Sequence, residues 1–89
     1  MLTKKEKDKI IEKYKVHEKD TGSAEVQIAI LSEEVKRLTG HLKDHKKDFS
    51  SRRGLLRKVG QRRRLLRYLE KDNLKSFEDL TVKLKLKKK

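Results

Sequence analysis

The chain has 89 residues and a formal net charge of +13, with 46% charged and 33% hydrophobic residues. A chain of this length holds one domain with a thin core, so we expect its apolar residues to lie in narrow stripes along regular secondary structure. The absence of cysteine excludes disulfides and thiolate metal sites, and the absence of a long apolar run or a signal-peptide segment predicts a cytosolic protein without a membrane span.

The first predicted helix runs over about 4–15. Its apolar side consists of Ile10, Ile11 and Tyr14. A helix this short, with so thin a stripe, is marginal by itself. We therefore expect residues 1–16 to form a mobile first helix.

A turn precedes the second predicted helix, which runs over 24–44. Residues 20–23 all favour turns and caps, and either Thr21 or Ser23 can accept a hydrogen bond from a free amide at a helix start. The apolar residues of this helix recur at steps of four and three, which is close to heptad spacing. They are Ala24, Ile28, Leu31, Val35, Leu38 and Leu42. This periodicity is the strongest secondary-structure signal in the chain.

The third predicted helix runs over about 51–71, after a short polar link that predicts an antiparallel pair with the second helix. The candidate caps are Asp48, Ser50 and Ser51. The apolar stripe comprises Leu55, Leu56, Val59, Leu66 and Leu69. Gly54 and Gly60 each cost roughly 1 kcal/mol of helix propensity relative to alanine. Glycine in such a place often allows another backbone to approach closely.

A fourth helix is predicted over about 74–85. Its packing residues are Phe77, Leu80 and Leu84. Two start signals compete, because Ser76 begins a stretch that resembles a capping box and Asn73 lies directly before the helix. Residues 85–89 form a basic tail. The four segments predict an all-α fold in which three helices pack as a small bundle beside a mobile N-terminal helix.

Positive charge is concentrated in the second half of the chain. Residues 1–45 hold ten Lys or Arg against nine Asp or Glu, a net charge of +1, whereas residues 46–89 hold seventeen against five, a net charge of +12. No acidic residue lies between Asp48 and Glu70, where eight basic residues occupy sixteen positions: Arg52, Arg53, Arg57, Lys58, Arg62, Arg63, Arg64 and Arg67. Arginine dominates, and its planar fork matches phosphate oxygens.

A solvated helix face usually mixes charges of both signs, so we interpret this segment as a phosphate-binding surface rather than an ordinary exposed face. The residues that we expect to bind phosphates are Lys46, Lys47, Arg52, Arg53, Arg57, Lys58, Arg63 and Arg67.

The aromatic residues bear on the form of the nucleic acid. Only Tyr14, Phe49, Tyr68 and Phe77 are present, and a single-strand binder needs a row of stacking platforms that this chain lacks. Structured, helical nucleic acid is the better interpretation, and charge does not decide between RNA and DNA. Duplex RNA is recognised through shape, phosphates, 2′-hydroxyls and the shallow groove. Tyr68 lies within the basic segment, where it either contacts RNA or packs in the core with a solvated hydroxyl.

Two other classes of protein share the charge argument. A histone-like DNA architectural protein usually needs a dimer or minor-groove wedges. A basic amphipathic protein at anionic membranes needs free bulky apolar residues opposite its arginine face, and the few in this chain are needed for the core. We expect no membrane partner, a monomer when free, and no enzymatic activity, since no nucleophile–base constellation is present.

A polar corner is predicted where the second helix ends and the third begins. Folding is expected to bring together His41, Asp48 and Ser51, and a carboxylate within a basic patch can accept hydrogen bonds from the amino group of a base. The alternative is that Asp48 and Ser51 only cap the third helix. The spacing of His41, His45 and Asp48 also suits a metal, but nearby lysines oppose a cation, and we expect no metal and no cofactor.

Three stretches of the sequence carry a family resemblance. They are DTGSAEVQ at 20–27, HLKDHKKD at 41–48 and SRRGLLRKVGQRRRLLRYL at 51–69. Together they cover more than half of the chain and closely resemble bacterial small-subunit ribosomal protein fifteen. The resemblance implies a four-helix protein whose first helix can swing.

The resemblance also implies partners. It implies a primary binder of 16S rRNA that grips a three-way helix junction and helps nucleate the platform of the small subunit. It further implies contact with neighbouring small-subunit proteins and with 23S rRNA through an intersubunit bridge. Some members of the family bind their own messenger RNA.

Two RNA-contacting surfaces follow from the same resemblance. The junction surface maps onto Thr21, Gly22, Gln27, Arg64 and Tyr68. The groove-reading surface maps onto His41, Asp48 and Ser51, which favours groove reading over capping alone. Two positions depart from the family pattern: Ser50 stands where histidine is usual, and Gly40 where an acidic residue is frequent. We expect Ser50 to forgo a peripheral contact and Gly40 to loosen the end of the second helix.

Overall fold

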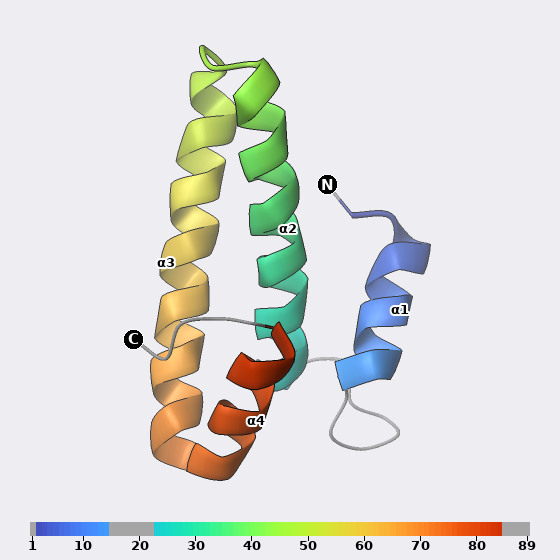
Figure 1. Ribbon diagram of the computed structural model, residues 1–89, viewed down its shortest axis with the longest axis vertical. Helices are drawn as coiled ribbons and strands as arrows, with labels where there is room; N and C mark the ends of the chain where they lie inside the picture. Colours follow the sequence, from blue (N-terminus) through green and yellow to red (C-terminus); the bar gives the residue numbers. More distant parts are fainter. Residues whose placement is uncertain (1, 15–22, 85–89) are drawn as a thin grey trace.

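The computed structural model describes residues 2–14 and 23–84, and within these ranges it contains four α-helices and no strand (Figure 1). The helices are α1 (Lys4–Tyr14), α2 (Ala24–Asp44), α3 (Phe49–Asp72) and α4 (Leu74–Leu84). The predicted all-α fold is confirmed. Residues 15 and 85, the last of the predicted first and fourth helices, lie outside the described ranges, as does the basic tail.

Side-chain caps set the helix starts. The Ser23 hydroxyl accepts a hydrogen bond from the Val26 amide at 3.3 Å and begins α2. Asp48 caps α3, which therefore starts at Phe49, two residues earlier than predicted. Asn73 caps α4 by accepting from the Ser76 amide at 3.1 Å, so Asn73 and not Ser76 is the start signal of α4. Each cap satisfies an amide that has no partner inside its helix.

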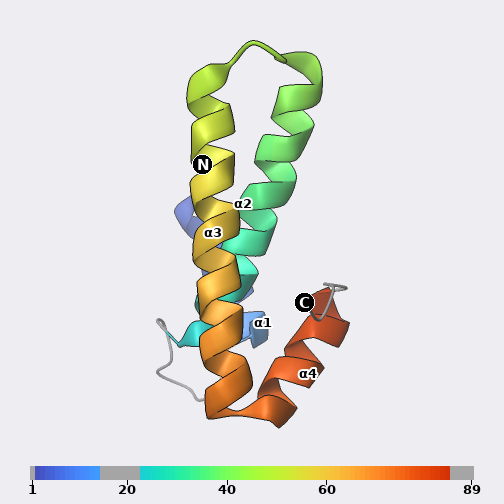
Figure 2. The same ribbon diagram turned by 90° about the vertical axis from the view of Figure 1, so that its left-hand side faces the viewer.

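The α2–α3 hairpin is the frame of the molecule. The two helices run antiparallel, as predicted, and the chain reverses at one end of the pair (Figures 1 and 2). At the opposite end α4 folds back against them, and the core forms where the three helices meet. Its buried residues are Ile28, Leu69, Phe77 and Leu80. Removing these apolar side chains from water is the main stabilising term for so small a core.

Helix α1 lies on the side of α2 that is opposite α3 (Figure 1). Leu2 is buried, and Glu6 forms an ion pair with Arg37 of α2. On α2, Val26 and Ala29 are buried although the heptad seam does not include them, and Ala29 shares the wall of a hollow with α1. Sequence periodicity describes one packed face of α2, whereas the folded helix is covered on more than one. The mobility of α1 stays a prediction.

One prediction about α3 is wrong. Leu56 is 66% exposed and does not belong to the packed stripe. Leu55 and Leu56 are neighbours about 100° apart around the helix, so they cannot both face α2. The glycines also have no close neighbour inside the protein: a Cβ atom on Gly54 or Gly60 would meet no described atom within 4 Å. The same holds at Gly40, through which α2 continues without a break.

A polar layer joins α2 and α3. Glu34, only 6% exposed, accepts a hydrogen bond from the Lys58 ammonium at 3.1 Å. The Arg62 guanidinium lies 3.4 Å from the Ser32 hydroxyl, which in turn donates to the Ile28 carbonyl at 2.8 Å. Burial lowers the pKa of Arg62. Such buried polar groups are costly unless they are paired, so this layer favours one alignment of the hairpin.

Candidate RNA-binding surface

The side of α3 that faces away from α2 is a row of arginines. Arg53, Arg57, Arg64 and Arg67 are all exposed, and steps of three, four and seven residues place them on one face of the helix. Within the described residues, none of these four guanidinium groups has a carboxylate or hydrogen-bond partner. We call these four residues the arginine row. Unpaired like charges held side by side suit a polyanionic partner.

Two basic residues of the same segment face the other way. Lys58 is paired with Glu34, and Arg62 is half-buried against Ser32. The eight basic residues counted in the sequence therefore fall into two groups. Lys58 and Arg62 pack against α2, and the other six are exposed. Arg63 is exposed beside the arginine row. The Lys58 ammonium is the one predicted phosphate ligand that already has a buried partner in the described part of the chain.

The tip of the hairpin adds further positive charge. Lys46 and Lys47 are exposed, and Arg52 donates a hydrogen bond to the Lys46 carbonyl at 2.9 Å. The Arg52 guanidinium also lies 5.7 Å from the centre of the Phe49 ring, which is itself 60% exposed. Sequence reasoning assigned no role to Phe49. Its only signal was its place inside the basic segment.

The polar corner forms as predicted where α2 ends and α3 begins. His41, Asp48 and Ser51 meet there, because α2 carries the histidine to the tip and the cap of α3 holds the other two. Asp48 accepts three hydrogen bonds: from the Ser51 amide at 3.1 Å, from the Ser51 hydroxyl at 2.7 Å and from His41 Nε2 at 2.8 Å. A carboxylate can only accept, so Nε2 is the protonated ring nitrogen.

These hydrogen bonds stabilise the charged form of Asp48. The Ser51 hydroxyl, the Ser51 amide and the His41 ring together lower the pKa of Asp48 from 3.8 to about 2. The carboxylate is thus ionised at neutral pH. A carboxylate has about four acceptor positions, and three are used here. One position is left for a donor from outside the protein.

The histidines at this corner stack on each other rather than converge on a point. The rings of His41 and His45 have centroids 4.5 Å apart and planes inclined by 29°. Among the described residues, no group of three or more His, Cys, Asp or Glu is arranged to hold a metal ion. His41 and Asp48 are joined by the hydrogen bond between Nε2 and the carboxylate.

The predicted junction surface lies at the other end of the hairpin. Gln27 near the start of α2 and Tyr68 near the end of α3 are exposed, as is Arg64. Tyr68 is 60% exposed, which rules out the alternative that it is a core tyrosine. The other two predicted members, Thr21 and Gly22, lie outside the described residues. Tyr68 is seventeen residues from Ser51, which is about 25 Å along a helix.

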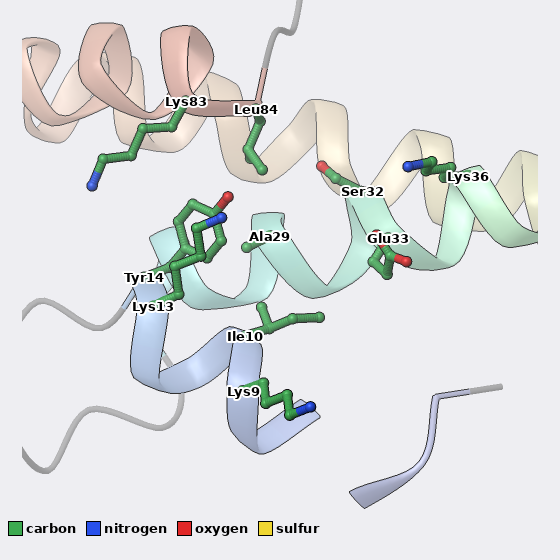
Figure 3. Close-up of a pocket in the computed structure, with 10 residues that line it drawn as sticks. All are labelled: Lys9, Ile10, Lys13, Tyr14, Ala29, Ser32, Glu33, Lys36, Lys83 and Leu84. Carbon is green, nitrogen blue, oxygen red and sulfur yellow. The ribbon is translucent and has the colours of Figure 1, made fainter. Parts of the chain in front are cut away.

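A hollow of about 350 Å³ lies between α1, α2 and α4 (Figure 3). Ile10 and Ala29 are on its apolar wall, and Tyr14 has the ammonium groups of Lys13 and Lys83 near its ring, at 5.5 and 6.0 Å. No sequence signal identifies this hollow, because it depends on where α1 packs.

None of the four helices, over the residues described, has both the length and the apolar composition of a membrane span.

Comparison with known proteins decides the family. The sequence profile of the family described as ribosomal protein S15 matches residues 7–87. The chain belongs to the ribosomal protein S15 family. It is 59% identical over 87 residues to the small ribosomal subunit protein uS15 of Carboxydothermus hydrogenoformans, which covers 98% of each chain. It is 57% identical over 88 residues to the uS15 protein of Caldanaerobacter subterraneus, with 99% of this chain and 100% of the relative covered.

Membership of the ribosomal protein S15 family confirms the resemblance found in the three sequence stretches. It also fits the four-helix architecture. Proteins of this family are structural proteins and not enzymes. The geometry described above therefore bears on binding rather than on catalysis.

Proposed function

We propose that this protein is a structural component of the small ribosomal subunit in the cytoplasm, where it binds 16S rRNA directly and early in assembly. It grips a three-way helix junction and the duplex beside it, and thereby helps nucleate the platform. The observation that carries the proposal is the arginine row, whose exposed guanidinium groups lack a partner within the described residues. The names of its S15 relatives, which assign them to the small subunit, support the choice of rRNA.

The arginine row and the basic hairpin tip supply affinity. Arg53, Arg57 and Arg67, together with Arg52, Arg63 and the lysines at 46 and 47, neutralise phosphates and release counterions from the RNA. Arginine is suited to this because its fork makes two parallel hydrogen bonds to one phosphate. Lys58 can join them only by sharing its ammonium with Glu34. These contacts position the protein but carry no sequence information.

The polar corner supplies part of the specificity. The shallow groove of duplex RNA exposes base edges, among which guanine presents an amino donor. The remaining acceptor position of Asp48 and the lone pairs of the Ser51 hydroxyl suit that donor. His41 holds the carboxylate at 2.8 Å and fixes its direction. Capping and groove reading are thus compatible, because the three internal hydrogen bonds to Asp48 leave one acceptor position unused.

The junction surface supplies the rest. Gln27, Arg64 and Tyr68 are exposed at the end of the hairpin opposite the polar corner, and we place Thr21 and Gly22 with them on the strength of the family resemblance. Two contact sites about 25 Å apart on one helix can engage a junction and an adjoining duplex together. Such simultaneous engagement raises affinity without new contacts at either site.

Further partners follow from the same proposal. In the assembled ribosome the protein touches neighbouring small-subunit proteins and reaches 23S rRNA through an intersubunit bridge. Its own messenger RNA is a third RNA target if that transcript presents a similar junction. The free protein is a monomer, it needs no cofactor, and it has no membrane partner.

Chemical footprinting on naked 16S rRNA tests the proposal. With protein present, we expect protection confined to one three-way junction and the duplex beside it. Scattered protection over many helices, or none, would contradict it. In binding titrations, six phosphate contacts give a log–log slope against salt of about −4 to −5, taking the nucleic-acid estimate as approximate for folded RNA.

A matched pair of variants separates the surface from general charge. Arg64→Gln and Lys75→Gln each remove one positive charge from an exposed helical position. Only the first lies on the arginine row. We expect Arg64→Gln to weaken binding to the junction RNA and to reduce the salt slope by about 0.7–0.9. Equal effects of the two changes would show that net charge, not this surface, drives binding.

A further inference from the structure

Helix α3 contains a glycine whose presence the described residues do not explain. Gly60 lies in the middle of a continuous helix of 24 residues. A Cβ atom at this position would meet no described atom within 4 Å, and its backbone does not adopt a positive φ. Glycine weakens a helix interior relative to alanine. Alanine would therefore fit and would strengthen the helix, yet glycine is present.

Gly60 lies at the centre of the arginine row. It follows Arg53 by seven residues and Arg57 by three, and it precedes Arg64 by four and Arg67 by seven. These steps place all five on one helix face. All four arginines are exposed. Gly60 thus lies on the same helix face as four exposed arginines, of which three are proposed to bind phosphates and Arg64 is proposed to contact the junction.

The absence of a side chain there lowers the surface of the helix. The Cα atoms of an α-helix lie about 2.3 Å from its axis, whereas side chains extend the radius to about 5–6 Å. At Gly60 the surface is therefore recessed by about 3 Å. Arg57 lies about 4.5 Å to one side of this recess along the axis, and Arg64 about 6 Å to the other.

We propose that Gly60 is a seat for the sugar–phosphate backbone of the bound RNA, which crosses α3 at this recess and approaches its main chain. Close approach lets Arg57 and Arg64 reach phosphates on either side of the crossing point. The charge of the row selects a polyanion, and the recess sets how near that polyanion comes. The inference rests on the proposed RNA-binding function and specifies where on α3 the strand passes.

Gly54 provides the control. It is also open to solvent on α3, with no described atom within 4 Å of a Cβ. Its neighbours three and four residues away are Ser50, Ser51, Arg57 and Lys58, of which only Arg57 belongs to the arginine row, whereas Gly60 has both Arg57 and Arg64 at these steps. Lys58 is paired with Glu34. Gly54 therefore lies at the side of the arginine row, not within it. Alanine at either glycine should strengthen α3 similarly, so the two changes differ mainly in their position relative to the row.

The test measures the stability and the RNA affinity of Gly60→Ala, Gly60→Gln and Gly54→Ala with a three-way-junction fragment of 16S rRNA. We expect both alanine variants to melt at a higher temperature than the wild type. Gly60→Ala should bind RNA more weakly, and Gly60→Gln at least about 10-fold more weakly, which corresponds to the loss of one hydrogen bond to a charged group. Gly54→Ala should bind within about twofold of the wild type, well under the tenfold that one such bond represents.

Wild-type affinity in both Gly60 variants would overturn the inference, as would an equal loss in Gly54→Ala. Arg64→Gln in the same titration keeps this failure distinct from failure of the proposed function. If Arg64→Gln binds weakly while the Gly60 variants bind normally, the arginine row binds RNA without a recessed seat. If Arg64→Gln also binds normally, RNA does not lie on this face and both proposals fall.

Discussion

The pairing of Glu34 with Lys58 gives a prediction that separates stability from binding. Glu34 has a side chain only 9% exposed, and the Lys58 side chain is 26% exposed. Lys58→Met keeps the length of the stem but leaves the buried carboxylate without its cation. Removing one partner of a buried pair costs about 3–5 kcal/mol. Because the lysine end is partly hydrated, we expect about 2–3 kcal/mol here.

For a domain of this size that loss lowers the melting temperature by roughly 10–20 °C. Urea unfolding followed by circular dichroism gives the free energy directly, provided that the dependence on denaturant is unchanged. The double change Glu34→Leu with Lys58→Met should recover most of the loss, because an apolar pair replaces an ionic pair at little cost. The cycle should give a coupling of about 2 kcal/mol between the two positions.

The RNA affinity of the double variant completes the test. If the charge of Lys58 serves α2 and not the RNA, the double variant should bind the junction fragment as the wild type does and keep its salt slope. Two results together would refute the reasoning. The first is a loss of stability below about 0.5 kcal/mol in Lys58→Met, which is within the range of ordinary surface changes. The second is a smaller salt slope for the double variant than for the wild type. Lys58 would then belong with the phosphate ligands.

Three further predictions concern single residues. Asp48→Ala should reduce the preference for the target duplex over a generic duplex, measured by competition binding; equal losses on both RNAs would leave only the capping role. The Asp48 carboxyl should titrate near pH 2 in an NMR experiment, since its pKa is lowered to about 2, so the stabilisation by this cap is complete above about pH 4 and is lost as the pH falls through about 2. Ser51→Ala should raise that midpoint toward 3.8, and a wild-type midpoint already near 3.8 would contradict the hydrogen bonding described. Leu56→Gln should change the free energy of unfolding by no more than about 0.5 kcal/mol, whereas Ile28→Ala should cost about 2–5 kcal/mol; similar losses would restore Leu56 to the core.

The sequence predicted the helices well because their signals are local. Residues 24–44 carry a cap at Ser23 and a regular apolar seam, and the observed helix has the same bounds as the predicted one. The start of α3 was misplaced by two residues because three polar candidates within residues 48–51 competed, and only the hydrogen bonds of Asp48 decide among them.

The orientation of side chains around α3 was less predictable. Leu55 and Leu56 are equally apolar, and which of them faces α2 depends on the position of a second helix. Likewise Lys58 and Arg62 look like binding residues in the sequence. Their inward direction follows from Glu34 and Ser32, which lie 24 and 30 residues away. A count of charged residues along the sequence cannot reveal such long-range pairs.

The polar corner was predicted as a group, because His41, Asp48 and Ser51 flank one short link. What the sequence could not give is the number of bonds that Asp48 already makes. Because Asp48 accepts three internal hydrogen bonds, its carboxylate caps α3 and keeps one acceptor position for an external donor. Capping and groove reading are therefore not exclusive alternatives. The hollow beside Tyr14 was not predicted at all, since it exists only when α1 packs on α2.

The continuity of α3 has a consequence for how its length can evolve. The polar corner at Ser51 and the exposed Tyr68 are joined by unbroken helix, so every inserted residue moves one relative to the other by about 1.5 Å and turns it by about 100°. A single insertion would thus turn the two proposed contact sites toward different sides of a bound RNA. An insertion of seven residues leaves a turn of only about 20° but adds about 10.5 Å of separation. The length of α3 thus sets the separation and the relative orientation of the two sites. We expect substitutions to be tolerated along the helix far more readily than any change in its length.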